Sequence, residues 1–215
     1  MGIILLSLYI GLIFIRPMDW WEPVYNWRLV NTTALATVLA ALPRLLREHR
    51  SLWQVPETRV AAWLLVGVTL SWLQRLWVGG MISAFQDFGK IMVLYWLILL
   101  LARTPRGYRI LLWGLFGCVA WMAVNGMLEH FRGYGFGHQE PRWRPNYFDP
   151  EKGVWQIVAF GIFEDPNDPC LVFIVAIPLL WAEFRATKSS VLKVLALLII
   201  PMCGYGAWLT NSRGG

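Results

Sequence analysis

The sequence predicts an all-α protein that spans a membrane about seven times, and three observations support this fold class. Of the 215 residues, 57% are hydrophobic and only 15% are charged, whereas about a quarter of the residues of a soluble domain are charged. The mean hydropathy is +0.50. Many of the 14 tryptophans lie at the ends of apolar runs, as in the aromatic belts of membrane proteins. We therefore expect one multi-pass transmembrane helical domain over residues 1–215.

Seven apolar segments are each expected to form a transmembrane helix. A helix rises about 1.5 Å per residue, so a run of about 14 residues covers only about 21 Å of a hydrocarbon core near 30 Å thick. The first, second and sixth segments are this short, and we expect them to recruit flanking residues or to thin the bilayer. A re-entrant or interfacial first pair is the alternative. The segments are Gly2–Ile15, Leu29–Leu42, Val60–Val78, Ile82–Ala102, Ile110–Leu128, Cys170–Ala182 and Val191–Leu209.

Lysine and arginine indicate the orientation of the chain. They are concentrated in three loops, and few occur in the short loops Arg16–Arg28 and Gly79–Gly80. The basic loops are Pro43–Arg59, Arg103–Arg109 and Glu183–Ser190. The positive-inside rule places these loops and the N-terminus in the cytoplasm. With an odd number of helices, the long loop Glu129–Pro169 and the C-terminal residues then share the periplasmic face.

Charge and cysteine patterns exclude several classes of function. The net charge of +6 would suggest a nucleic-acid partner in a soluble protein, but here the basic residues occupy loops beside the membrane, so we expect no nucleic acid. The cysteines stand singly in apolar runs without metal-ligand spacing, and are expected to be buried small side chains. No P-loop, dinucleotide fingerprint or hydrolase triad is found, and we expect neither a metal nor a cofactor.

The long loop contains basic residues that alternate with aromatic residues. Guanidinium groups form charge-assisted hydrogen bonds with phosphate oxygens, and aromatic rings offer apolar faces on which a pyranose can stack. Arg142, Arg144 and His138 are therefore candidate substrate-binding residues. The alternative is a solvated periplasmic loop whose aromatic side chains enter the lipid headgroups.

Two further polar strings adjoin apolar helices. The first, Gly161-x-x-x-Asp165-Pro166-Asn167, precedes the sixth helix, where Asp168 is expected to be the N-cap. The second, Thr210-Asn211-Ser212-Arg213-Gly214-Gly215, follows the seventh. An arginine presents a planar fork of donors that suits phosphate, and paired glycines let a backbone approach a ligand closely. The second string therefore predicts an anion site at the membrane face.

Together the two strings resemble the O-antigen ligase and polymerase superfamily of bacterial membrane glycosyltransferases. In that family G-x-F-x-(D/N)-x-N precedes a helix, and the next periplasmic helix end carries T-x-S-R-G. The Lys90-Ile91-Met92 stretch and the basic loop Arg103–Arg109 further resemble the O-glycosylation ligases associated with exosortase A. The resemblance covers roughly Phe85 to Gly215.

The resemblance implies a multi-pass protein of the bacterial inner membrane that transfers a glycan from undecaprenyl pyrophosphate to an acceptor hydroxyl on a lipid or protein. Arg213 matches the family's arginine and is the expected catalytic residue. Ser212, Asp165 and Asn167 are expected to bind substrate. The family's base lies on a later periplasmic loop, so we expect this chain to be the N-terminal part of a longer protein and to be inactive alone.

Two other classes of function remain as alternatives. A transporter or flippase for an anionic lipid or polysaccharide would use the same arginines as a binding path, and would move its substrate without covalent transfer. A non-catalytic subunit would anchor a periplasmic complex through the long loop.

Overall fold

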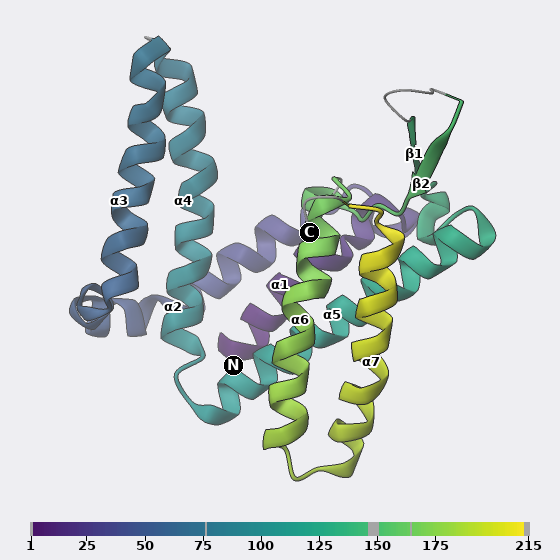
Figure 1. Cartoon of the computed structure of the whole chain (residues 1–215). Helices are drawn as coiled ribbons and strands as arrows, with labels where there is room; N and C mark the ends of the chain where they lie inside the picture. Colours follow the sequence, from purple (N-terminus) through teal and green to yellow (C-terminus); the bar gives the residue numbers. More distant parts are fainter. Residues whose placement is uncertain (1, 76, 146–150, 164, 213–215) are drawn as a thin grey trace. The chain divides into compact units, whose positions relative to one another are not determined.

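The structure is a computed structural model that describes residues 2–75, 77–145, 151–163 and 165–212, apart from the side chains of residues 49–51. The described residues form helices and one small sheet, which confirms the predicted all-α class (Figure 1). The α-helices are α1 (Gly2–Ile15), α2 (Leu29–Gln54), α3 (Pro56–Leu70), α4 (Val78–Leu101), α5 (Pro105–Arg132), α6 (Asn167–Ala186) and α7 (Ser190–Leu209).

Six helices among the described residues are long and apolar enough to cross a membrane, so the chain is a multi-pass membrane protein by helix length and hydropathy. The predicted segment Val60–Val78 is divided. α3 has 15 residues, and the 3-10 helix η3 (Ser71–Arg75) follows it directly. The Ser71 hydroxyl donates a 2.7 Å hydrogen bond to the Val68 carbonyl, and such a local bond competes with the α-helical pattern. α3 and η3 together measure roughly 30 Å.

The basic stretch Pro43–Arg59 is more helical than the sequence suggested. α2 continues through Pro43 as far as Gln54, and α3 begins at Pro56 after a break at Val55. A proline at the first helical position costs nothing because its missing N–H would have had no partner there. The predicted cytoplasmic loop is therefore mostly the end of one helix and the start of the next.

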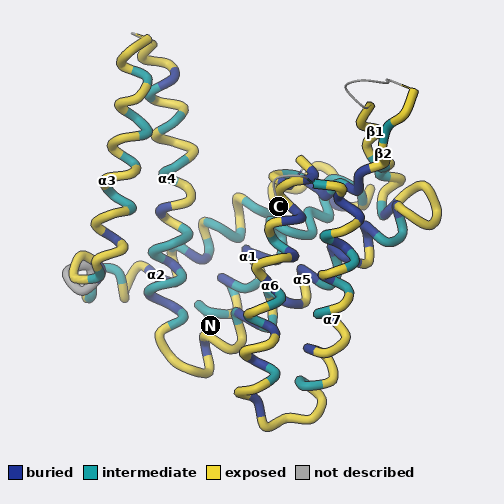
Figure 2. The backbone as a smooth tube through the Cα atoms, viewed as in Figure 1, coloured by how far each residue is buried: buried dark blue, intermediate teal, exposed yellow. Residues whose placement is uncertain are grey.

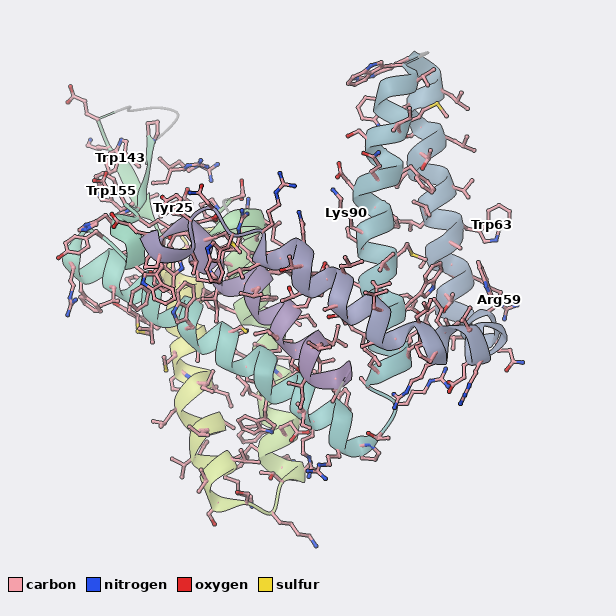
Figure 3. All side chains as sticks on the ribbon, turned by 180° about the vertical axis from the view of Figure 1, so that it is seen from behind. Tyr25, Arg59, Trp63, Lys90, Trp143 and Trp155 are labelled. Atoms are coloured by element: carbon pink, nitrogen blue, oxygen red, sulfur yellow. The ribbon has the colours of Figure 1, made fainter. Side chains whose placement is uncertain are left out.

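The chain divides into two compact units, which are described separately. The first comprises Met1–Leu6 and Asn31–Leu111. In it α3 and α4 lie side by side and antiparallel (Figure 1), and the Thr58 and Tyr95 hydroxyls are 3.3 Å apart between them. Many large apolar residues of these two helices are exposed, and most of the pair has the colour of exposed or half-buried residues in Figure 2. Trp63, for example, projects away from α4 (Figure 3).

The second unit comprises Ser7–Val30 and Leu112–Gly215. Its core is formed by α5, α6 and α7, with Phe116, Phe173 and Leu180 almost fully buried. α6 and α7 form an antiparallel hairpin (Figure 1). All three cysteines are buried, as expected, and none forms a disulfide. Small residues at a helix interface allow close approach in a membrane, and Gly206 of α7 illustrates this, because an added Cβ would lie 3.0 Å from the Phe173 ring.

The long loop carries a feature that the sequence did not predict. Strands β1 (Arg142–Pro145) and β2 (Gly153–Gln156) pair antiparallel, with Trp143 opposite Trp155. We call this hairpin the β-ribbon. Cross-strand aromatic pairs stabilise such short strands, and the two indole rings are 5.0 Å apart with an interplanar angle of 57°.

We expect Gly206→Leu to destabilise the α6–α7 hairpin by about 1–3 kcal/mol, because the new side chain must displace Phe173. Gly204→Leu is the matched control, since this glycine lies on the same helix with no atom within 4 Å of an added Cβ. The measurement is the melting temperature of each purified variant in detergent. Equal melting temperatures for the two variants would contradict the packing described.

Candidate functional site

Two distant polar strings meet at one end of the α6–α7 hairpin. Because the helices are antiparallel, the start of α6 and the end of α7 lie at the same end (Figure 1). The Ser212 hydroxyl donates a short hydrogen bond to the Asn167 side-chain oxygen, across 45 residues of sequence. The Ser212 N–H donates to the Thr210 hydroxyl at 3.2 Å. Predicted site residues from both strings are thus in direct contact.

Asp165 holds Asn167 in place. Its Oδ1 atom accepts hydrogen bonds from the Asn167 backbone N–H at 2.8 Å and from the Asn167 side-chain Nδ2 at 2.6 Å. The expectation that Asp168 is the N-cap is wrong: α6 begins at Asn167, its N-cap is Pro166, and Asp168 lies in the first turn. Hydrogen bonds therefore link Asp165 to Asn167 and Asn167 to Ser212 in a continuous chain. Arg213, the predicted catalytic residue, lies outside the described residues.

The other predicted binding residues lie elsewhere on the same unit. Arg142 and Arg144 are exposed residues of β1, and Arg142 lines a cavity of about 440 Å³ together with Asp19 and Glu140. His138 faces the Tyr134 ring at 5.4 Å. Arg142 and Arg144 lie on the β-ribbon and His138 lies in the segment before it, whereas Asp165, Asn167 and Ser212 lie at one end of the α6–α7 hairpin. The structure thus brings Asp165, Asn167 and Ser212 together, but it does not bring Arg142, Arg144 or His138 to them.

Asn211 connects the end of α7 to the β-ribbon, a role that the sequence analysis missed. Its Nδ2 donates to the Trp155 carbonyl at 2.9 Å, and its own carbonyl accepts from Gln156 Nε2 at 3.0 Å. The Ile157 N–H reaches the Leu209 carbonyl at 3.4 Å. Asn211 has a φ of 46°, a left-handed conformation that asparagine tolerates after a helix end. That preference was the available sequence signal.

A buried polar network fixes the long loop to α5. Glu129 is fully buried, and its Oε1 accepts from Asn125 Nδ2 at 2.6 Å while its Oε2 accepts from the Val158 N–H at 3.0 Å. Asn125 Oδ1 accepts from the Phe136 N–H at 2.7 Å, and Asn125 Nδ2 is also 3.3 Å from Gln139 Oε1. The sequence signal was the spacing of four residues, which places Asn125 and Glu129 on one face of an apolar helix.

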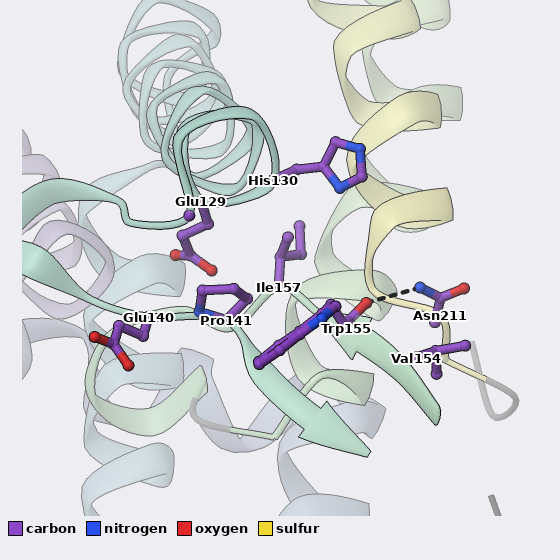
Figure 4. Close-up of a pocket in the computed structure, with 9 residues that line it drawn as sticks. Glu129, His130, Glu140, Pro141, Val154, Trp155, Ile157 and Asn211 are labelled. Carbon is purple, nitrogen blue, oxygen red and sulfur yellow. Dashed lines mark hydrogen bonds between the residues drawn. The ribbon is translucent and has the colours of Figure 1, made fainter. Parts of the chain in front are cut away.

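A cavity of about 470 Å³ lies between this network and the β-ribbon (Figure 4). We call it the Glu129 cavity. Its lining combines carboxyl, amide and aromatic groups with apolar side chains, and includes Glu129, His130, Gly133, Glu140, Pro141, Val154, Trp155, Ile157 and Asn211. Figure 4 shows Trp155 and Glu129 facing the cavity from different elements, with the Asn211 bond to the Trp155 carbonyl beside them. Pockets with mostly apolar walls and a few polar groups are typical of small-molecule sites.

No group of three or more His, Cys, Asp or Glu side chains that could hold a metal ion occurs in the described part of the chain. Comparisons of the chain with protein-family models, with curated proteins and with solved structures found no match.

We expect Asn125→Leu to destabilise the second unit by about 1–3 kcal/mol, because it removes hydrogen bonds to Glu129 and to the Phe136 N–H while leaving those groups buried. Protease cleavage within residues 133–141 should become faster. Asn31→Leu, at an exposed position of α2, is the control. Cleavage rates unchanged from wild type would show that the network does not hold the loop.

Proposed function

We propose that this chain forms the donor-binding part of a membrane glycosyltransferase, which transfers a glycan from undecaprenyl pyrophosphate to an acceptor hydroxyl. The observation that carries the proposal is the contact between Ser212 and Asn167. These residues belong to the two strings on which the resemblance to O-antigen ligases rests. Their contact supports the resemblance, because residues of both strings are hydrogen-bonded to each other at one end of the hairpin.

The reaction requires a group that stabilises the departing pyrophosphate. The acceptor oxygen bonds to the anomeric carbon, the bond from that carbon to the pyrophosphate oxygen breaks, and the acceptor proton passes to a base. Negative charge grows on the pyrophosphate, so a fixed guanidinium binds the transition state more strongly than the ground state. Arg213 follows Ser212 directly and is the proposed source of that charge.

Asn167 and Ser212 are proposed to position the donor. Both Asn167 donor groups are directed to Asp165, which fixes the orientation of the amide, and its oxygen receives the Ser212 hydroxyl. Positioning groups are effective when neighbouring bonds restrict their rotamers. The proposed role of Asp165 is therefore to orient Asn167, and the carboxylate does not have to contact the anionic carrier.

The proposed site faces the periplasm only if the chain crosses the membrane seven times. The third crossing would then consist of α3 and η3 together. The cytoplasmic placement of the N-terminus follows from the basic loops. The combined length of α3 and η3, roughly 30 Å, matches the thickness of the hydrocarbon core. If α3 does not cross, the long loop lies on the cytoplasmic side with the basic stretch Pro43–Arg59, and the basic loops Arg103–Arg109 and Glu183–Ser190 lie on the opposite side.

Cysteine labelling tests this topology. In a chain whose three buried cysteines are replaced by alanine, we expect Glu151→Cys on the long loop to react with a membrane-impermeant maleimide added to intact spheroplasts. Arg106→Cys, exposed near the start of α5, should react only after the membrane is permeabilised. The opposite pattern would place the site in the cytoplasm and contradict the proposed donor orientation.

We expect Arg213→Ala, introduced at the chromosomal locus, to lower glycan transfer at least about 100-fold, the loss typical of removing a transition-state donor. Arg213→Lys should also fail if two parallel hydrogen bonds to phosphate are required. Transfer is measured in membranes from the lipid-linked donor. Arg185→Ala, exposed in the last turn of α6, is the control at the other end of the hairpin.

Wild-type transfer by Arg213→Ala would overturn the assigned role. Movement of the lipid-linked glycan across the membrane without covalent transfer, in the wild-type protein, would instead support a transporter or flippase.

A further inference from the structure

We propose that the Glu129 cavity is a carbohydrate subsite that takes an uncharged pyranose ring of the glycan. The inference deepens the proposed function and rests on it, because the ring in question belongs to the transferred glycan. It concerns a site that neither of the two polar strings predicted. Its volume, about 470 Å³, is within the range of about 300–1,000 Å³ typical of ligand pockets.

Trp155 provides the apolar wall on which a sugar ring can stack. The residue is 57% exposed, although it lies beside a well-packed helical core. Its position is fixed by the Trp143 ring at 5.0 Å and by the bond from Asn211 to its carbonyl. An indole that is both exposed and held in place offers a large contact area at low cost in conformational entropy. Figures 3 and 4 show this side chain on the β-ribbon and at the cavity.

Glu140 provides acceptors for sugar hydroxyls. It is an exposed residue of the cavity lining, and a carboxylate has about four acceptor positions. Glu129 is fully buried, and its two oxygens bind the Asn125 amide and the Val158 N–H. Its part is therefore to hold the cavity wall in place and not to contact the sugar.

The charge of the described lining disfavours acidic sugars. Among the described residues that line the cavity, Glu140 is an exposed carboxylate and none is lysine or arginine. A uronic acid or a sulfated sugar would place a second anion beside Glu140, and such like-charge contacts select against a ligand. The cavity is therefore suited to an uncharged sugar and not to an acidic one.

The position of the cavity suits a sugar close to the carrier. Asn211 lines the cavity, and the next residue, Ser212, contacts Asn167. A ring bound against Trp155 would lie beside the proposed phosphate-binding residues. This places the subsite on the donor side of the reaction.

Tryptophan oxidation footprinting tests the proposal. The probe is the glycan released by mild acid from the host's lipid-linked donor, added to the natural gene product in lipid nanodiscs. Mass spectrometry should show at least about threefold slower oxidation of Trp155. Trp27, in the short segment before α2 and 61% exposed, should be unchanged and is the matched control.

Binding variants provide the second measurement. By saturation-transfer NMR with the same probe, Trp155→Ala should bind at least about tenfold more weakly, whereas Trp155→Phe should retain most of the affinity. Trp63→Ala should bind like wild type. A tetragalacturonate probe should not protect Trp155.

Three results would overturn the subsite: no protection of Trp155 by the released glycan, equal binding by Trp155→Ala, or equal protection by tetragalacturonate. The proposed function fails separately. Arg213→Ala should abolish transfer yet leave Trp155 protection intact, because the released glycan lacks pyrophosphate. Full transfer by Arg213→Ala, with Trp155 still protected, would leave a sugar site and remove the proposed catalytic arginine.

Discussion

Glu129 places a carboxyl group in the last turn of a membrane-spanning helix, where solvent does not reach it. A buried carboxyl group without hydrogen-bond partners costs a few kcal/mol, so the chain must bring partners to it. Val158 and Asn125 do so, and Asn125 in turn binds the Phe136 N–H. Both ends of the long loop are thereby held against α5, and the β-ribbon between them is confined to one region of the unit.

The end of α7 supplies the second constraint on the β-ribbon. Asn211 donates to the Trp155 carbonyl and accepts from the Gln156 side chain, while Ser212 binds Asn167 at the start of α6. The hairpin beneath them is closely packed around Phe173 and Leu180. The candidate site therefore combines three chain segments on a rigid base, which is the arrangement that precise positioning of a substrate requires.

Hydropathy predicted most of the helices because backbone groups in lipid must be bonded within their own segment. The meeting of Asn167 and Ser212 followed from that pattern, since consecutive antiparallel helices bring those ends together. Local hydrogen bonds were less predictable: the Ser71 hydroxyl ends α3 early, and Asp165 bonds to Asn167 in place of a cap by Asp168. Asn125 and Glu129 were missed because their partners, Phe136 and Val158, lie in a loop without periodicity. The β-ribbon likewise depends on a tertiary pair, Trp143 with Trp155.

In the proposed function, the charges on either side of Asn211 favour one orientation of the donor. Glu140 lines the Glu129 cavity, whereas the proposed pyrophosphate-binding residue, Arg213, follows Ser212 in the sequence. A reversed donor would bring its phosphates to Glu140, and at an effective dielectric constant near 20 a close pair of like charges costs about 4 kcal/mol. We therefore expect the Glu140 carboxylate to contribute to specificity through repulsion, while the buried network around Glu129 holds the loop that carries Glu140.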